Sequence, residues 1–286
     1  MDKENAVSER CNMLIRTISG AVYVIILALF FLLRQFVDPK IFHVLTCFFI
    51  IVGTFEIARA LKQKIISWAY YVSIIYAVLF VPCYLLGQYV FNNLGYLLAI
   101  TLFIIMALAT CLYSLVKGFS VQKFLWTALV FFYPAMLLLA MLLANDLGNN
   151  GFIVLILAFV ISPASDVFAY LVGSMMGGKK LCPKLSPKKT WSGAIGGTIG
   201  GVVASLAVYF IFLPKVNFFS PILLFAVVGL VASIVNIFGD LFESFIKRKV
   251  GIKDMGKIMP GHGGVLDRID GTMPVTLFLY LVFLFV

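Results

Sequence analysis

Long apolar segments separated by short polar ones make up most of the chain. A helix that crosses a membrane needs about 20 mostly apolar residues, and this criterion predicts nine spans. They cover residues 14–33, 41–60, 66–90, 94–116, 121–143, 151–176, 191–213, 220–246 and 271–286. The last is short for a hydrocarbon core of about 30 Å, so it needs a locally thinned bilayer or the help of neighbouring helices. We therefore predict an all-α fold, a polytopic transmembrane helical bundle of about nine spans.

The composition supports this class and excludes a soluble domain. Apolar residues make up 63% of the chain and charged residues 12%, whereas soluble domains carry about 25% charged residues. The polar residues 1–10 lead into an apolar run that many others follow, so we expect a first span and not a cleaved secretory leader. The five cysteines are scattered without a CxxC pair, so neither a disulfide framework nor a zinc site is expected.

Lysine and arginine residues gather on one side of the predicted bundle. Cytoplasmic loops accumulate these residues and translocated loops do not. With a cytoplasmic N-terminus, only Arg34, Lys40 and Lys215 of the 22 Lys and Arg residues lie in loops on the opposite side. We expect a multi-pass protein of the cell's inner (plasma) membrane, and the Lys and Arg bias sets its orientation. Its N-terminus and two densely charged loops, residues 177–190 and 247–270, are predicted to face the cytoplasm.

The two halves of the chain differ in their polar residues. Residues 1–150 contain about five predicted spans and generic basic loops, which orient a protein and attract anionic lipid head groups, and they add nothing specific. Residues 151–286 contain both charged loops, where cations are mixed with Asp, Gly and Pro. We predict an N-terminal membrane region followed by a membrane region that carries the chemistry. The net charge of +10 does not indicate nucleic-acid binding, because the loops lack interleaved aromatic residues and any recognisable binding module.

Acidic residues inside apolar segments are candidates for function, since an ionisable group in a membrane is costly unless it is paired or hydrated. Glu56, near the inner end of the second span, is best explained by a pair with Arg59 or by a position at the interface. Asp166 has apolar sequence on both sides and no basic residue within a helical turn or two. The serines and the proline at 162–165 suggest a locally opened helix, which a membrane tolerates where backbone lines a cavity. Asp166 is therefore a candidate functional residue.

Two further acids lie near the inner end of the eighth span. Asp240 and Glu243 are three residues apart and share one helical face, which Asn236 extends. They could pair with Lys247 or Arg248 one turn later. Alternatively, they could face a hydrated pocket and bind a hard divalent cation such as Mg²⁺, which shares its shell between one or two carboxylates, waters and substrate phosphates.

The charged loop that follows combines acids with glycines. Asp267 and Asp270 are again three apart, and Gly263 and Gly264 leave the backbone open to the close approach of a phosphate. His262 could donate a proton, bind a phosphate or pack the loop. Cations that can neutralise a phosphate surround this segment: Lys247, Arg248, Lys253, Lys257 and Arg268.

The other charged loop runs into the seventh span. It places cations and hydroxyl groups at the start of a helix: Ser186, Lys188, Lys189, Thr190 and Ser192. The exposed N–H groups and the dipole of a helix N-terminus already favour an anion. Phosphate binding therefore explains this loop. The glycines of the following helix, at 193, 196, 197, 200 and 201, predict close helix packing in the membrane.

Residues 244–270, which we call the signature segment, resemble the signature of the CDP-diacylglycerol synthases, also called phosphatidate cytidylyltransferases. The match comprises SFIKR, the KD pair at 253–254 and PGHGGVLDRID at 260–270, with Met259 where the family has Leu, Ile or Phe. SDVFAYLVG and LSPKKTWSG upstream are similar to that family too. The resemblance implies that CTP and phosphatidate react to CDP-diacylglycerol and pyrophosphate, with Mg²⁺, K⁺ as a possible second cation, and a homodimeric membrane enzyme.

This chemistry needs positioning and the neutralisation of two anions. Our hypothesis is that Asp240 and Asp267 hold Mg²⁺ and that Asp270 and Asp166 help to place the second cation. The predicted catalytic residues are Asp240, Asp267, Lys253, His262 and Arg268. The predicted substrate-binding residues are Ser186, Lys188, Lys189, Thr190, Ser192, Lys247, Arg248, Gly263 and Gly264.

Two other functions fit parts of the sequence. A CTP-dependent lipid-alcohol kinase shares the membrane setting and the basic loops, but it releases CDP and no pyrophosphate. A cation or organic-anion transporter also carries acids in its spans, but it is expected to distribute polar residues near the midplane, often in two related halves. Here the polar residues gather towards the inner face of the second half.

Overall fold

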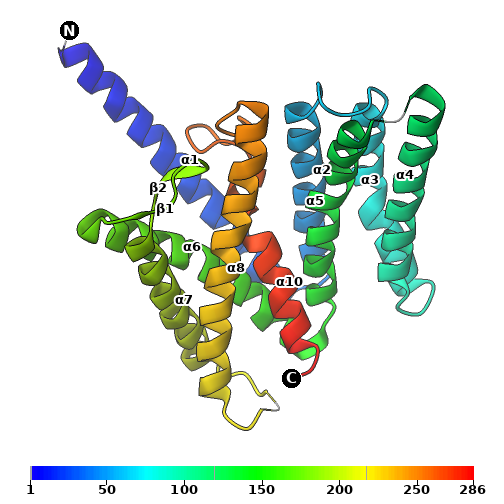
Figure 1. Ribbon diagram of the computed structural model, residues 1–286. Helices are drawn as coiled ribbons and strands as arrows, with labels where there is room; N and C mark the ends of the chain where they lie inside the picture. The colour runs from blue at the N-terminus through cyan, green and yellow to red at the C-terminus, as the bar shows by residue number, and fades with distance from the viewer. Residues whose placement is uncertain (1, 119, 217) are drawn as a thin grey trace. The chain divides into compact units, whose positions relative to one another are not determined.

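The computed structural model describes residues 2–118, 120–216 and 218–286. Eight of its helices are long and apolar enough to cross a membrane (Figure 1). They are α1 (Asp2–Phe36), α2 (Ile41–Ala60), α3 (Ala69–Tyr89), α4 (Gly95–Lys117), α5 (Val121–Asn145), α6 (Gly151–Met176), α7 (Trp191–Phe212) and α8 (Pro221–Val250). The predicted class, a polytopic helical membrane bundle, is confirmed.

The remaining elements are short. The predicted ninth segment forms α10 (Thr272–Phe283), whose 12 residues span about 18 Å at about 1.5 Å per residue. A helical turn, η1 (Gly148–Asn150), precedes α6. Helix α9 (Leu266–Ile269) begins within the last residues of the loop at 252–268, which we call the signature loop. The strands β1 (Lys180–Cys182) and β2 (Ser186–Thr190) pair antiparallel between α6 and α7. The sequence pattern did not predict this hairpin, because its strands are only 3 and 5 residues long.

The chain packs as two compact units. The first contains the chain up to Met136 together with residues 252–268, and the second contains residues 137–251 and 269–286. The loop after α8 thus belongs to the first unit, and the functional division that we predicted at residue 150 stays a prediction. The signature segment therefore supplies residues to both units.

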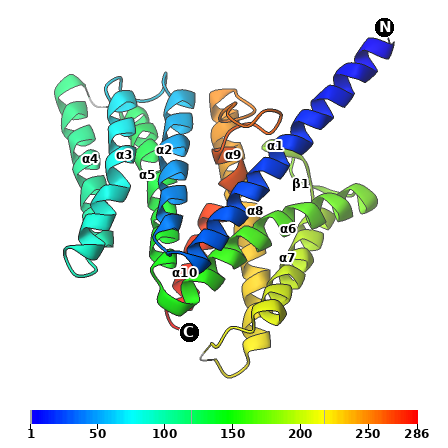
Figure 2. The same cartoon turned by 180° about the vertical axis from the view of Figure 1, so that it is seen from behind.

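Aromatic packing stabilises the helices of the first unit. Helices α2, α3 and α4 lie side by side in both views (Figures 1 and 2). The ring of Tyr76 in α3 makes edge contacts with Phe80 and with Phe131 of α5, at centroid distances of 5.5 and 5.2 Å. A Cβ added at Gly53 in α2 would lie 3.3 Å from Leu266. This close fit places the end of the signature loop against α2.

Glycines bring the helices of the second unit close together. A Cβ added at Gly196 of α7 would lie 2.5 Å from Cβ of Val172 in α6, and one at Gly200 would lie 2.5 Å from Phe168. On another side of α7, a Cβ at Gly201 would overlap Ser233 of α8. Nothing larger than a hydrogen atom fits at these contacts, so the predicted packing role of the α7 glycines is confirmed.

Candidate functional site

The loop at residues 252–268 and helix α1 line an open pocket of about 600 Å³ in the first unit, which we call the loop pocket. Arg16 of α1 lines it together with residues of the loop: Lys253, Asp254, Gly256, Lys257, Met259, Pro260, Gly261, His262, Gly263 and Arg268. The structure thus brings together four of the predicted site residues, namely Lys253, His262, Gly263 and Arg268.

A tight turn shapes the loop pocket. The N–H of His262 donates to the carbonyl of Met259 at 2.9 Å, and Gly261, the third residue of this turn, has a φ of +74°. A type II turn requires a positive φ at this position. A Cβ added at Gly261 would also lie 2.6 Å from Cγ of Arg16. Glycine is therefore needed here both for the turn and for the close approach to α1.

Asp267 organises the backbone of the loop. Its Oδ2 accepts hydrogen bonds from the N–H groups of Met255 and Gly264, both at 2.8 Å, and the residue is only 9% exposed. The N–H of Gly264 is therefore used inside the loop. The substrate-binding role of Gly264 and the metal-binding role of Asp267 stay predictions.

Glu56 of α2 anchors the same loop. Its carboxylate accepts hydrogen bonds from the N–H groups of Val265 and Leu266, at 3.1 and 2.9 Å, and the residue is 2% exposed. A Cβ added at Gly264 would lie 2.5 Å from both carboxylate oxygens. The sequence-based explanation of Glu56, a local pair with Arg59 or an interfacial position, is wrong, because the carboxylate instead bonds to buried loop backbone.

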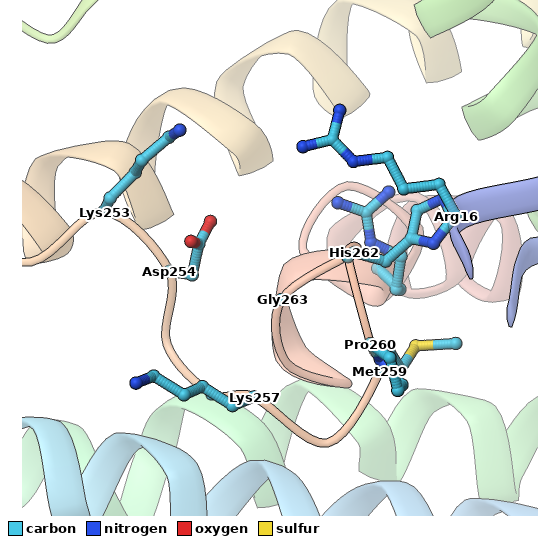
Figure 3. Close-up of a pocket in the computed structure, with 11 residues that line it drawn as sticks. Arg16, Lys253, Asp254, Lys257, Met259, Pro260, His262 and Gly263 are labelled. Atoms are coloured by element: carbon cyan, nitrogen blue, oxygen red, sulfur yellow. The ribbon is translucent and has the colours of Figure 1, made fainter. Parts of the chain in front are cut away.

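The loop pocket is strongly basic. Figure 3 shows Arg16 entering from α1 and Lys253 from the loop. Asp254 is the one acid among the described residues that line the pocket. Burial, followed by the positive charges of Arg268 and Arg16, lowers the pKa of His262 from its ordinary value of about 6.5. The same positive charges disfavour the imidazolium and suit the pocket to an anion with several oxygens.

Helix α1 contributes residues that the sequence reasoning missed. We found nothing specific in the first half of the chain, yet Arg16 lines the loop pocket and Oγ of Ser19 lies 2.8 Å from Nδ1 of His262. The two residues are three apart at the inner end of an apolar span, so they share a helical face. That polar pair was the available signal.

A second cavity, of about 440 Å³, lies between the hairpin, α6, α7 and α8 in the second unit, and we call it the hairpin pocket. Its charged lining residues are Asp166, Lys180, Lys188, Lys189 and Asp240. Lys189 forms an ion pair with Asp240. The side-chain amide of Asn236 donates to Asp166 at 2.9 Å. Lysines from the predicted phosphate loop thus meet two of the predicted metal ligands.

The two acids of α8 follow different alternatives of the sequence analysis. Glu243 pairs with Lys247, one helical turn later, at 3.5 Å. Asp240 lines the hairpin pocket instead and accepts a hydrogen bond from Ser244 at 3.3 Å in addition to its ion pair with Lys189. The local pairing is therefore correct for Glu243 and wrong for Asp240.

Polar groups hold the start of α7 beside this pocket. Oγ1 of Thr190 accepts a hydrogen bond from the N–H of Gly193 at 3.1 Å, as an N-cap does. Ser192 donates to the carbonyl of Gly177. Thr190 lines the hairpin pocket.

Ser186 begins β2, and Nε of Arg248 donates to the carbonyl of Leu185 in the hairpin turn at 3.3 Å. Substrate binding by Ser186, Ser192, Lys247 and Arg248 stays a prediction.

Carboxylates of the second unit form the best candidate for a cation site. Asp166, Asp240 and Asp270 lie close enough for their charges to interact. Within the described residues, no group of three or more His, Cys, Asp or Glu side chains is arranged to hold a metal ion by itself. Mg²⁺ usually takes one or two carboxylates and completes its shell with water and substrate phosphates. These oxygen donors therefore fit a cation that arrives with a phosphate.

Comparison with known proteins identifies the family. Residues 15–286 match the sequence model of the cytidylyltransferase family. A phosphatidate cytidylyltransferase of Brucella abortus is 40% identical over 156 residues, which are 54% of this chain and 56% of the relative. The enzyme of Helicobacter pylori is 36% identical over 147 residues, which are 51% of this chain and 52% of the relative. The enzyme of Staphylococcus haemolyticus is 37% identical over 125 residues, which are 44% of this chain and 46% of the relative. The chain thus spans about half the length of the curated relatives it matches. Because the family match covers nearly the whole sequence, the chain belongs to the cytidylyltransferase family.

Proposed function

We propose that this protein is a phosphatidate cytidylyltransferase, which converts CTP and phosphatidate to CDP-diacylglycerol and pyrophosphate. The observation that carries the proposal is the basic loop pocket, which is built by the signature segment of a chain with eight apolar helices long enough to cross a membrane. A lipid phosphate and a nucleotide triphosphate repel each other, so an enzyme that joins them must neutralise both. Relatives with this name support the choice of substrates.

The loop pocket can neutralise a phosphate and hold it in place. Arg16 and Arg268 offer planar donor groups that match phosphate oxygens, and Lys253 adds a point charge. An oxygen of the phosphatidate phosphate forms a bond to the α-phosphorus of CTP. The bond from that phosphorus to the pyrophosphate group breaks, and pyrophosphate leaves with the electron pair. A phosphomonoester has a second pKa of about 6, so the attacking phosphate is mostly ionised at neutral pH.

The hairpin pocket has the residues to hold a cation and phosphates together. In our proposal Asp240, with Asp166 and Asp270 nearby, holds Mg²⁺, and Lys188 and Lys189 bind phosphate oxygens. When bound, the cation supplies charge neutralisation for the departing pyrophosphate. K⁺ as a second cation and ligation by Asp267 belong to the same proposal.

The setting of the reaction is also part of the proposal. We propose that the active site faces the cytoplasm from the inner (plasma) membrane, where CTP is available and phosphatidate reaches the site from the bilayer. The excess of Lys and Arg in the loops on the N-terminal side supports this orientation. We further propose that the working form is a homodimer, as the family resemblance implies.

A labelling experiment tests the reaction. The full-length protein in detergent micelles with phosphatidate and Mg²⁺ should transfer label from [α-³²P]CTP to lipid and release label from [γ-³²P]CTP as pyrophosphate. Label from [γ-³²P]CTP in the lipid would instead indicate a lipid kinase and contradict the proposal. Lys253→Ala should lower the rate by about 100-fold. Lys123→Ala, which removes an exposed cation at the start of α5 in the same unit, is the matched control and should not change the rate.

A further inference from the structure

The hydroxyl group of Ser19 contacts three polar groups at once. Its Oγ lies 2.8 Å from Nδ1 of His262, 2.9 Å from the carbonyl oxygen of Pro260 and 3.0 Å from that of Arg16. A hydroxyl has a single proton to donate and lone pairs with which to accept. The position of that proton therefore decides which nitrogen of the imidazole carries a hydrogen.

The Nδ1–H tautomer satisfies more of these contacts than the Nε2–H tautomer. If Ser19 donated to Nδ1 of His262, both carbonyl oxygens would face lone pairs of Oγ at about hydrogen-bond distance with no proton between them, which is repulsive. If Ser19 donates to one of the two carbonyl oxygens, Nδ1–H of His262 donates to Oγ, and a single carbonyl oxygen instead of two faces Oγ without a proton. A neutral imidazole has one ring proton, so Nε2 is then unprotonated.

The imidazole is also held in place by close packing. Gly20 follows Ser19 in α1, and a Cβ there would lie 3.3 Å from Cε1 of His262. The turn that presents His262 is closed by its own N–H bond to Met259. The ring orientation is thus fixed from both the helix and the loop.

We propose that Ser19 is a positioning residue that holds His262 in the Nδ1–H tautomer, which makes Nε2 the proton acceptor of the loop pocket. The chemical use of this acceptor rests on the proposed function. Where the phosphatidate phosphate is still singly protonated, as it mostly is below a pH of about 6, Nε2 takes its proton while the freed oxygen bonds to the α-phosphorus of CTP. Pyrophosphate leaves with the electrons of the broken bond, and the imidazolium returns the proton to water. The lowered pKa of His262 agrees with a neutral acceptor.

The tautomer can be observed directly. The chain has two histidines, so ¹⁵N-histidine labelling of the full-length protein in micelles gives two imidazole signals, and the signal lost in His262→Gln belongs to His262. Above the pKa of His262, we expect a proton on Nδ1 and an unprotonated, pyridine-type Nε2. Ser19→Ala should replace this state with a mixture of tautomers or with Nε2–H. Ser73→Ala, which removes a serine hydroxyl bonded to a carbonyl three residues earlier in α3, should leave the signal unchanged.

Kinetics separate positioning from folding. Ser19→Thr keeps the hydroxyl group. Ser19→Val introduces a side chain of the same shape as threonine but without a hydroxyl group. We expect Ser19→Thr to retain the wild-type tautomer and kcat, and Ser19→Val to lower kcat about tenfold, as expected for one lost hydrogen bond, with less than a twofold change in KM for CTP and phosphatidate. Equal behaviour of the Thr and Val variants would overturn the proposal, as would Nε2–H in the wild type. These spectra need no substrate, so a failure of cytidylyl transfer would contradict the proposed function without affecting the tautomer result.

Discussion

Glu56→Gln should loosen the signature loop without changing its sequence. The carboxylate of Glu56 accepts one hydrogen bond on each oxygen, from Val265 and Leu266, and it is buried. A glutamine amide has the same shape but only one oxygen, so one of the two backbone N–H groups must face an NH₂ group instead. The substitution therefore removes one bond and leaves a buried donor without an acceptor.

The expected cost follows from this count. A hydrogen bond to a charged group contributes about 1.5–3 kcal/mol to stability, and a buried donor left unsatisfied costs a similar amount. We expect the closed state of the loop to lose about 2 kcal/mol. Because about 1.4 kcal/mol corresponds to a factor of ten, the population of the open loop should rise about 30-fold.

Hydrogen–deuterium exchange measures this opening. When the loop closes faster than its exposed amide protons exchange, the exchange rate is proportional to the population of the open loop. The peptide covering residues 252–268 should therefore exchange about 30-fold faster in Glu56→Gln than in the wild type. Thr46→Val is the control, because Thr46 is another buried polar residue of α2 and bonds only to the carbonyl of Phe42 among the contacts described for it. An exchange rate in Glu56→Gln within about twofold of the wild-type rate would refute the reasoning.

Three further predictions concern charge, packing and cation binding. Arg16→Gln removes a positive charge that disfavours the imidazolium, so the midpoint of the ¹⁵N titration of His262 should move to higher pH; an unchanged or lower midpoint would contradict this. Gly196→Val places side-chain atoms where Val172 already lies, so the free energy of unfolding should fall by about 1–3 kcal/mol, measured as a lower thermal midpoint. Asp240→Asn should lower kcat about 100-fold and raise the Mg²⁺ concentration for half-maximal rate; near-wild-type turnover would contradict the cation assignment.

The helical spans could be predicted from the sequence because the signal for a span is local. Length and apolarity alone gave residues 41–60 for the second span, and α2 runs from Ile41 to Ala60. The α7 glycines likewise indicated close packing without any knowledge of the partner helix. The hairpin at 180–190 was not predicted, since its strands are too short to show a period.

The partners of the polar residues could not be predicted, because they are distant in the chain. Glu56 binds backbone 209 and 210 residues away, and Ser19 meets a ring 243 residues away. Helical spacing offered Asp240 only the cations one turn later, whereas its partner in the structure is Lys189 of the hairpin. The pair that helical spacing did predict, Glu243 with Lys247, joins two residues of the same helix.

The charges of the two pockets suit different parts of the proposed reaction. Among the described residues that line the loop pocket, basic side chains outnumber the single acid, Asp254, so this pocket favours an anion that comes without its own cation, such as a lipid phosphate. The hairpin pocket combines three lysines with Asp166 and Asp240. A triphosphate with a bound divalent cation carries negative and positive charge. In a pocket with lysines and aspartates, the lysines can neutralise the phosphates and the aspartates can neutralise the cation. The signature segment supplies most of the lining of the loop pocket, and its Ser244 donates a hydrogen bond to Asp240, which lines the hairpin pocket.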